Sequence, residues 1–476
     1  MVGLVKFDMG MVSDMHAPES AGPVLPACEH EPRRYDGPSK AAVLAQRQQY
    51  CHPALFTYYR EPLMIVEGWR QWLFDETGRR YLDGFAGIVT VSVGHCHPKV
   101  TARLREQIEQ LQHTTTIYLH PNIGDYAEAL AARMPEGSGL SNSYFVNSGS
   151  EANELAIQMA RYYTGNYDVI ALRNCYHGGS VMTQGLNSHY TWKFPQGQSH
   201  GVHHAIQPDP YRCPFEGSPE AIARKCAQDV LDLIRYSTPG RIAAFIAEPI
   251  QGVGGATSAA NNYFGEVYDI VRAHGGICIS DEVQTGFGRT GDHFWGFENF
   301  GVVPDVVTMA KGIGNGFPLG AVVTRPEIAR SFTSRIHFNT FGGNPMACAV
   351  GRAVLDVIEE EGLQENARVV GGHLKAGLKE LQERHEALGD VRGMGLMLGL
   401  DLVSDREGRT PDREAAIEVQ EHARKLGLLV GRGGLEGNVI RLKPPLCVTR
   451  EDGDFMIEVF DAALTRWEAM RGASRP

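Results

Sequence analysis

The stretch Thr308-Met309-Ala310-Lys311-Gly312-Ile313-Gly314-Asn315-Gly316 contains a lysine, Lys311, that stands between an apolar run and a glycine-rich turn. A lysine at a desolvated strand end has a lowered pKa, which makes its amine a usable nucleophile toward carbonyl groups. The glycines let the chain bend sharply and leave room for a planar ring, but they lack the G-x-G-x-x-G spacing of a dinucleotide site. Taken alone, Lys311 would be interpreted as a surface lysine, the commonest place for this residue.

The sequence on both sides of Lys311 predicts an α/β fold with a mostly parallel sheet covered by helices. Between residues 100 and 345, helical patterns alternate with short apolar runs, which is typical of such a sheet. An amphipathic helix is predicted over Glu151–Thr164, with Ala152, Leu155, Met159 and Tyr162 on one face. Buried strands are predicted at Val169–Leu172, Ile242–Ala247, Gly276–Ser280, Asp305–Met309 and Leu319–Thr324.

The pattern changes near residue 347 to that of a smaller α+β domain. Helices are predicted over 347–360, 365–385, 412–426 and 452–470, strands over 395–402 and 428–430, and a loop from there to Pro445. We divide the chain into four parts. They are an N-terminal arm, partly flexible, at 1–45; a segment at 46–98 that contributes to the small domain and the active-site wall; a large cofactor-binding domain at 99–345; and a small domain at 346–476.

Polar residues follow several of the predicted strands. Ser148, Gly149 and Ser150 begin a helix, where free backbone N–H groups and the helix dipole favour a bound phosphate. If this motif is considered on its own, a helix N-cap is the simpler interpretation. Asp281 follows a buried strand, at the sheet edge where ligands of open α/β sheets bind. A carboxylate there can pair with a protonated ring nitrogen. Its neighbour Glu282 is interpreted as part of a solvated loop.

Two further strand ends carry candidate residues. Tyr176 can stack on a planar cofactor, whereas His177, taken alone, is interpreted as a structural hydrogen-bonding residue. Glu248 stands at another strand end, in Ala247-Glu248-Pro249-Ile250-Gln251-Gly252. A phosphate cradle, an aromatic plate, a partner for a ring nitrogen and a lysine together make the inventory of a pyridoxal phosphate site.

From about Tyr50 to the C-terminus the sequence resembles the class III (subgroup II, fold type I) pyridoxal-phosphate aminotransferases. The most specific match is residues 281–289, Asp-Glu-Val-Gln-Thr-Gly-Phe-Gly-Arg, followed by Lys311-Gly312. Within that class it looks most like the alanine–glyoxylate aminotransferases of the mitochondrial type. The stretches that support this are residues 86–98, 309–318 and 337–345. The resemblance implies pyridoxal 5′-phosphate as cofactor and a large domain plus a smaller α+β domain.

The resemblance also implies roles for matching positions. Lys311 would hold the cofactor as a Schiff base and shuttle a proton, and Asp281 would hold the ring nitrogen; both are the catalytic residues. The cofactor would also contact Ser148, Gly149, Ser150, Tyr176, His177, Glu248, Val283, Gln284 and, from the neighbouring subunit of a dimer or dimer of dimers, Thr340. Arg441 would bind a substrate carboxylate. Glu248 would pair with this arginine and so regulate its availability. Ile88 and Val89 would form part of the wall of the active site.

The bulk composition excludes several partners. The net charge of −11 and the lack of a basic cluster make nucleic acid an unexpected partner, and no apolar run is long enough to cross a bilayer.

The cysteines and the N-terminal residues bear on the compartment. Nine scattered cysteines without a C-x-x-C pair fit reduced thiols in a cytoplasmic enzyme. The first 45 residues contain six acidic residues, unlike a transit peptide. His95-Cys96-His97 has metal-like spacing, but we favour a structural role and predict no metal site.

The predicted reaction moves an amino group from an alanine-like, β- or ω-amino acid to pyruvate or glyoxylate. The alternatives are an ω-amine or β-amino acid:pyruvate aminotransferase of a specialised pathway, a pyridoxal-phosphate aminomutase or decarboxylase, and a non-catalytic protein that keeps the fold. The stretch of residues 187–229 has no recognisable motif, and its histidines His200, His203 and His204 suggest an exposed loop.

Overall fold

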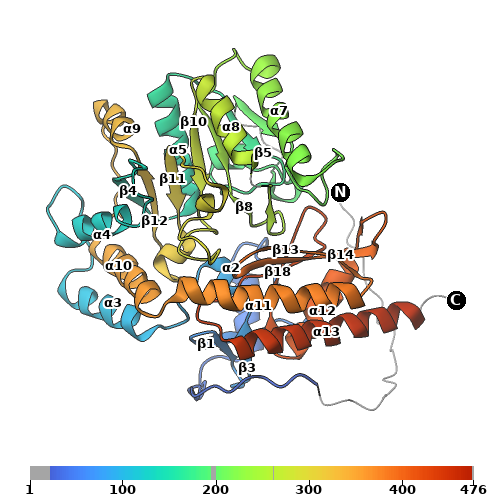
Figure 1. Cartoon of the computed structure of the whole chain (residues 1–476). Helices are drawn as coiled ribbons and strands as arrows, with labels where there is room; N and C mark the ends of the chain where they lie inside the picture. Colours follow the sequence, from blue (N-terminus) through green and yellow to red (C-terminus); the bar gives the residue numbers. More distant parts are fainter. Residues whose placement is uncertain (1–21, 195–199, 261, 474–476) are drawn as a thin grey trace.

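The structure is a computed structural model that describes residues 22–194, 200–260 and 262–473. Of the N-terminal arm predicted over residues 1–45, residues 1–21 lie outside the described residues, so its partial flexibility stays a prediction. Two α/β units stand one above the other, the larger at the top of Figure 1 and the smaller below it. The domain boundaries stay predictions. Among the helices of the described ranges, none combines the length and the apolar character that spanning a bilayer requires.

The large unit is built on a seven-stranded sheet. Its order is β4 (Asn142–Val146), β12 (Gly320–Thr324), β11 (Val306–Met309), β10 (Ile277–Asp281), β7 (Ala244–Ala247), β5 (Val169–Leu172) and β6 (Val202–Ala205). All neighbours from β11 to β6 are parallel, and β12 runs antiparallel to both β11 and β4. The mostly parallel sheet predicted from the sequence is therefore confirmed.

Helices cover both faces of this sheet (Figure 1), so its central strands are buried throughout. One face packs against α5 (Gly149–Thr164), and the other against α7 (Pro219–Ser237) and α8 (Asn262–Ala273). Gly165 ends α5 in the left-handed conformation, as its sequence predicts. Tyr162 departs from the prediction: it is 46% exposed, because the end of α5 extends past the sheet to contact Phe332.

The small unit contains two more sheets. One joins β1 (Ile65–Trp69), β2 (Trp72–Asp75) and β3 (Arg80–Asp83) to β16 (Leu428–Leu429), so the N-terminal and C-terminal segments share a sheet. The other is built from β13 (Leu388–Met394), β14 (Met397–Asp405), β18 (Val439–Leu442) and β17 (Gly431–Gly433), with β15 (Thr410–Pro411) at its side. Beside it in Figure 1 run α11 (Leu363–Arg384), α12 (Arg413–Lys425) and α13 (Arg450–Ala473).

The described residues contain further α-helices outside these groups. They are α1 (Lys40–Tyr50), α2 (Ala86–Val89), α3 (Pro98–Gln110), α4 (Pro121–Ala131), α6 (Val181–Leu186), α9 (Pro326–Ser331) and α10 (Pro345–Glu360). The last of these packs against α3 and α4. A short two-stranded sheet, β8 (Ile250–Gln251) with β9 (Thr257–Ser258), follows β7. These elements set the walls around one edge of the large sheet.

Two expectations about loops are wrong. The chain before Pro445 is not a loop, because β17 and β18 lie in it. The exposed loop predicted for His200, His203 and His204 is confirmed for His200, which is exposed in a turn, but is wrong for His203 and His204, which lie on β6 and are partly buried. The ring of His203 bonds to Asp168 at 2.8 Å, and that of His204 to the carbonyl of Leu186 at 2.9 Å. Both rings thus fix an edge strand to the chain beside it.

Candidate active site

Four of the predicted site residues lie at one edge of the large sheet, because each follows a parallel strand. Asp281 is the last residue of β10, and Glu248 directly follows β7. Lys311 comes just after β11, where Asp281 pairs with Thr308 in the register of the two strands. Tyr176 follows β5 on the far side of β7. The sequence placed all four at strand ends, and the sheet order brings those ends together.

Asp281 is buried and holds three hydrogen bonds. Its Oδ2 accepts from Nδ1 of His177 and from Nδ2 of Asn153, both at 2.7 Å, and its Oδ1 accepts from the backbone N–H of Val283 at 3.1 Å. Burial acts to lower the pKa of His177, but Cys175 and the bond to Asp281 outweigh it and raise that pKa well above its usual value. A protonated His177 places a positive charge and an N–H donor beside the Asp281 carboxylate.

Lys311 begins the short 3₁₀ helix η3 (Lys311–Gly314) with a φ of +52°. This left-handed backbone is costly for a residue with a side chain and is characteristic of functional sites, where the surroundings enforce it. Burial lowers the pKa of its amine, Asp281 and Glu248 oppose that effect, and Arg441 adds to it. A lowered pKa leaves more of the amine uncharged at neutral pH, as a nucleophile requires.

The start of α5 forms the predicted phosphate cradle. Ser148 is the N-cap, because its Oγ accepts from the N–H of Glu151 at 3.2 Å. The N–H groups of Gly149 and Ser150, in the first turn, have no intrahelical acceptor and are available to an anion. A Cβ at Gly149 would come within 3.1 Å of Cγ2 of Val283, so the glycine keeps the space beside the helix start open.

Glu248 and Arg441 lie in the same buried region but do not pair. The carboxylate of Glu248 accepts from the N–H of Tyr176 at 3.1 Å and of Gly252 at 2.7 Å, and burial raises its pKa. Arg441, on β18, donates weakly to the carbonyl of Gly252 at 3.5 Å, and its Nε has no partner among the described residues. Within those residues no carboxylate lies within 4.0 Å of its guanidinium, so the regulation by Glu248 stays a prediction.

The predicted wall residues Ile88 and Val89 belong to α2, which is a turn of left-handed helix. The φ angles from Ala86 to Val89 are +52°, +57°, +63° and +65°. Asp83 stabilises its start, because Oδ1 accepts from the N–H of Ala86 at 2.8 Å. The turn buries Val89 and leaves Ile88 48% exposed. Ile88 is therefore the member of the pair whose side chain is free to contact a ligand.

A cavity of about 300 Å³ opens beside Arg441 and is lined by His189, Trp192, Val253 and Leu435, among others. The indole of Trp192 stands edge-on to the ring of Tyr176, with the centroids 5.1 Å apart. Trp192 thus links the cavity to the residue expected to stack on the cofactor. This arrangement gives a substrate carboxylate a route to the buried guanidinium.

Sequence reasoning missed two buried polar residues of the site, Asn153 and Lys443. Asn153 bonds to Asp281 and accepts from Oγ1 of Thr308 at 2.6 Å. Lys443 is fully buried, and its Nζ donates to the carbonyl of Gly252 at 3.1 Å and to Oε1 of Gln284 at 3.0 Å. A signal for Lys443 was present, since it stands two residues after Arg441 and so projects from the same side of an extended chain.

Thr340 is exposed, in the loop between η4 (Phe332–Ser334) and α10. The neighbouring Asn339 accepts from Nδ2 of Asn147 at 3.0 Å, so the loop touches the start of the cradle within the same chain.

His95 and His97 bond to two different carboxylates, as structural histidines do. His95 bonds to Asp83 at 2.8 Å, and His97 bonds to Glu361 at 2.7 Å.

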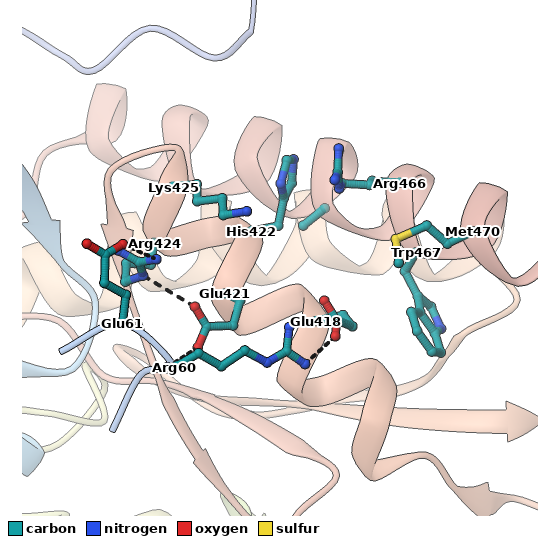
Figure 2. Close-up of a pocket in the computed structure, with 11 residues that line it drawn as sticks. Arg60, Glu61, Glu418, Glu421, His422, Arg424, Lys425, Arg466, Trp467 and Met470 are labelled. Atoms are coloured by element: carbon teal, nitrogen blue, oxygen red, sulfur yellow. Dashed lines mark hydrogen bonds and ion pairs between the residues drawn. The ribbon is translucent and has the colours of Figure 1, made fainter. Parts of the chain in front are cut away.

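A second pocket, of about 270 Å³, lies between α12 and α13 (Figure 2). Figure 2 shows two ion pairs in this pocket, Arg60 with Glu418 and Arg424 with Glu421. None of the predicted site residues lines it. We therefore place the candidate active site at the edge of the large sheet.

The residues at that edge fit pyridoxal phosphate. A buried carboxyl group is available for the ring nitrogen, an amine with a lowered pKa for the aldehyde, and a helix start for the phosphate. The glycine at that helix start leaves the space that a side chain would fill. The residues concerned are Asp281, Lys311, Gly149 and Ser150.

Comparison with known proteins agrees with this geometry. Residues 57–464 match the family profile described as aminotransferase class-III. The chain is 52% identical to alanine–glyoxylate aminotransferase 2 homolog 2, mitochondrial, of Arabidopsis thaliana over 93% of this chain and 91% of that protein. It is 46% identical to the human mitochondrial alanine–glyoxylate aminotransferase 2, over 93% and 90%. An amine transaminase from an uncultivated Pseudomonas species, solved in the pyridoxal-phosphate-bound internal aldimine form, superposes with a TM-score of 0.83 at 35% identity, over 88% of this chain and 98% of the other.

Proposed function

The chain belongs to the class-III aminotransferases, which depend on pyridoxal phosphate, and we propose that it moves the amino group of alanine or of a β- or ω-amino acid to glyoxylate or pyruvate. The observation that carries the substrate class is Arg441, a buried guanidinium with a free N–H beside an open cavity. An unpaired buried charge is costly, and a substrate carboxylate would satisfy it with two parallel hydrogen bonds. The names of the Arabidopsis and human relatives support alanine and glyoxylate.

The proposed mechanism assigns one task to each residue around the cofactor. When bound, pyridoxal phosphate supplies an electron sink for the bond that breaks at the substrate Cα. Lys311 would hold the cofactor through its Nζ and would use the same atom to move the proton at the substrate Cα. Asp281, bonded to His177, would hold the ring nitrogen. Arg441 fixes the carboxylate and so orients the Cα–H bond toward Lys311.

Arg441→Ala is expected to raise the KM for alanine and for glyoxylate by roughly 10²-fold, because a charge-assisted bidentate bond of about 3 kcal/mol is lost. A donor without a carboxylate, such as a primary alkylamine paired with a carbonyl acceptor that is not an acid, should be affected less than threefold. Initial rates with both donor classes check the prediction, since each class serves as the control for the other.

Equal losses for both donor classes would contradict the carboxylate-binding role of Arg441. If the wild-type enzyme prefers the alkylamine, the alternative of an ω-amine aminotransferase replaces the alanine–glyoxylate activity. An amine transaminase among the solved relatives makes this the second candidate. An aminomutase or decarboxylase would form product without any keto-acid acceptor, and the same assays reveal it.

We also propose a homodimer, or a dimer of dimers, in which Thr340 completes the neighbouring site. Three apolar side chains near Thr340 are exposed in the single chain: Ile336 by 95%, Phe338 by 52% and Phe341 by 61%. The ring of Phe341 contacts His113, close to the similarly exposed residues 117–119. Exposed apolar patches of this kind mark protein–protein contacts, and a second copy of the chain would cover this one.

A mixed dimer of Lys311→Ala and Thr340→Val chains is expected to keep about half of the wild-type activity. If Thr340 acts across the interface, one site combines both substitutions and the other has neither. The mixed dimer is isolated with two affinity tags, and the two parent dimers are the controls. A mixed dimer no more active than the Thr340→Val parent would place Thr340 in the site of its own chain.

We place the protein in the cytoplasm. The support is chemical: the nine cysteines of the chain are all free, which suits a reducing compartment. Cell fractionation followed by immunoblotting tests the location, and recovery of the protein in the mitochondrial fraction would overturn it.

A further inference from the structure

The fully buried Lys443 makes two hydrogen bonds that the proposed mechanism does not use. Its Nζ donates to the carbonyl of Gly252 at 3.1 Å and to Oε1 of Gln284 at 3.0 Å. The amide of Gln284 lies directly on Gly252, where a Cβ would come within 2.2 Å of the amide Nε2. Gln284 therefore has little freedom to move away from the lysine.

The surroundings of Lys443 favour its neutral amine. Burial lowers its pKa well below the usual value, and the neighbouring cations Arg441, Lys311 and Arg289 act in the same direction, opposed by Glu248. A neutral amine has two N–H groups, and the two oxygens it contacts use both. An ammonium would carry a third N–H with no acceptor, at a cost in a site closed to water.

This pairing decides which end of the Gln284 amide faces the site. The two ends of a primary amide have the same shape, so hydrogen-bond partners alone determine its orientation. With Oε1 bound by Lys443, the Nε2 end remains for a ligand, and it can only donate. We propose that Lys443 is a positioning residue that acts through Gln284, by fixing its amide so that Nε2 donates to the phenolic oxygen of the bound cofactor. The proposal rests on the proposed function.

Lys443→Met should raise the pH midpoint of the visible absorbance change of the holoenzyme by about one unit. An N–H donor at the phenolic oxygen stabilises negative charge there and so favours the form of the Lys311–cofactor linkage that has lost its proton. Without the lysine, Gln284 is free to turn and present its oxygen, and the linkage holds its proton to a higher pH. One unit corresponds to the loss of about one hydrogen bond.

A double-mutant cycle with Gln284→Met tests that the lysine acts through the glutamine. Gln284→Met alone should shift the midpoint in the same direction, and Lys443→Met should add less than 0.3 unit, roughly, in that background. The matched control is Lys375→Met, which removes another partly buried lysine bonded to a carbonyl, that of Gly393 at 2.8 Å, outside the site. It should leave the midpoint unchanged. The melting temperature of each apo protein reports the purely structural cost.

An unchanged midpoint in folded Lys443→Met, or an undiminished shift in the Gln284→Met background, would overturn the proposal. If Lys443→Met does not fold, Lys443→Gln replaces it. Because the glutamine amide still offers N–H donors, its shift should be smaller. A shift independent of Gln284 again counts against the proposal. A wild-type protein that shows no visible absorbance with pyridoxal phosphate would instead contradict the proposed function. The two failures are therefore distinguishable.

Discussion

Lys311→Ala is expected to purify as a folded protein without the yellow absorbance of the wild type and with transamination reduced on the order of 10⁴-fold. The substitution removes both the covalent attachment of the cofactor and the base that moves the proton at the substrate Cα. The backbone strain at a φ of +52° stays unchanged, because alanine keeps the Cβ that causes it. Absorbance spectra and single-turnover rates with added alanine measure the effect.

Small primary amines provide the sharpest control for this variant. The space vacated by the lysine side chain admits methylamine or ethylamine, and we expect these amines to restore part of the lost rate in proportion to their concentration. Lys375→Met, which lies outside the site, should keep the spectrum and the rate of the wild type. A yellow, active Lys311→Ala protein would show that another lysine carries the cofactor.

Asp281→Asn is expected to lower the rate of transamination roughly 10³-fold while the protein still binds pyridoxal phosphate. Asparagine matches the shape of aspartate but cannot hold a proton on the ring nitrogen. It also removes one of the two groups, Cys175 and Asp281, that raise the pKa of His177, so this pKa falls.

The comparison with His177→Gln separates the two effects. Gln can still donate a hydrogen bond to Asp281 but carries no charge, so we expect a loss of about 10-fold, far smaller than in Asp281→Asn. A cofactor analogue with a permanent positive charge at the ring nitrogen should restore Asp281→Asn and leave Lys311→Ala inactive. If Asp281→Asn transaminates at the wild-type rate with normal pyridoxal phosphate, the carboxylate does not act on the ring.

The sequence predicted best the elements whose signals are local. Val169–Leu172 forms a strand at those bounds, because a short apolar run between polar residues leaves few alternatives. Strand β13 was not predicted, since the glycines Gly389 and Gly393 disguise it, and their places are explained only by contacts with Tyr211 and with β14. The reversed direction of β12 was likewise beyond the sequence, because antiparallel pairing depends on the whole sheet.

The same distinction holds for the site. Asp281 and Lys311 were predictable because each stands at the end of its own strand, and the resemblance to a family gave them roles. Asn153 and Lys443 were not, because each is defined by a partner far along the chain: 128 positions separate Asn153 from Asp281, and 159 separate Lys443 from Gln284. An isolated asparagine in a helix has no distinguishing pattern of its own, and the signal for Lys443 is confined to its place two residues after Arg441.

The turn at Ala86–Val89 winds with the hand that a chain of D-amino acids would adopt. Each L-residue in it is less stable by about 1–2 kcal/mol than in a right-handed turn. Elsewhere in a protein, trimming a side chain to widen a binding site leaves a void and lowers stability. At Ile88 the expected change in stability has the opposite sign. Glycine would widen the wall of the binding site and would also accept a φ of +63° without penalty. Substrate range can therefore diverge at this position during evolution without a compensating change elsewhere.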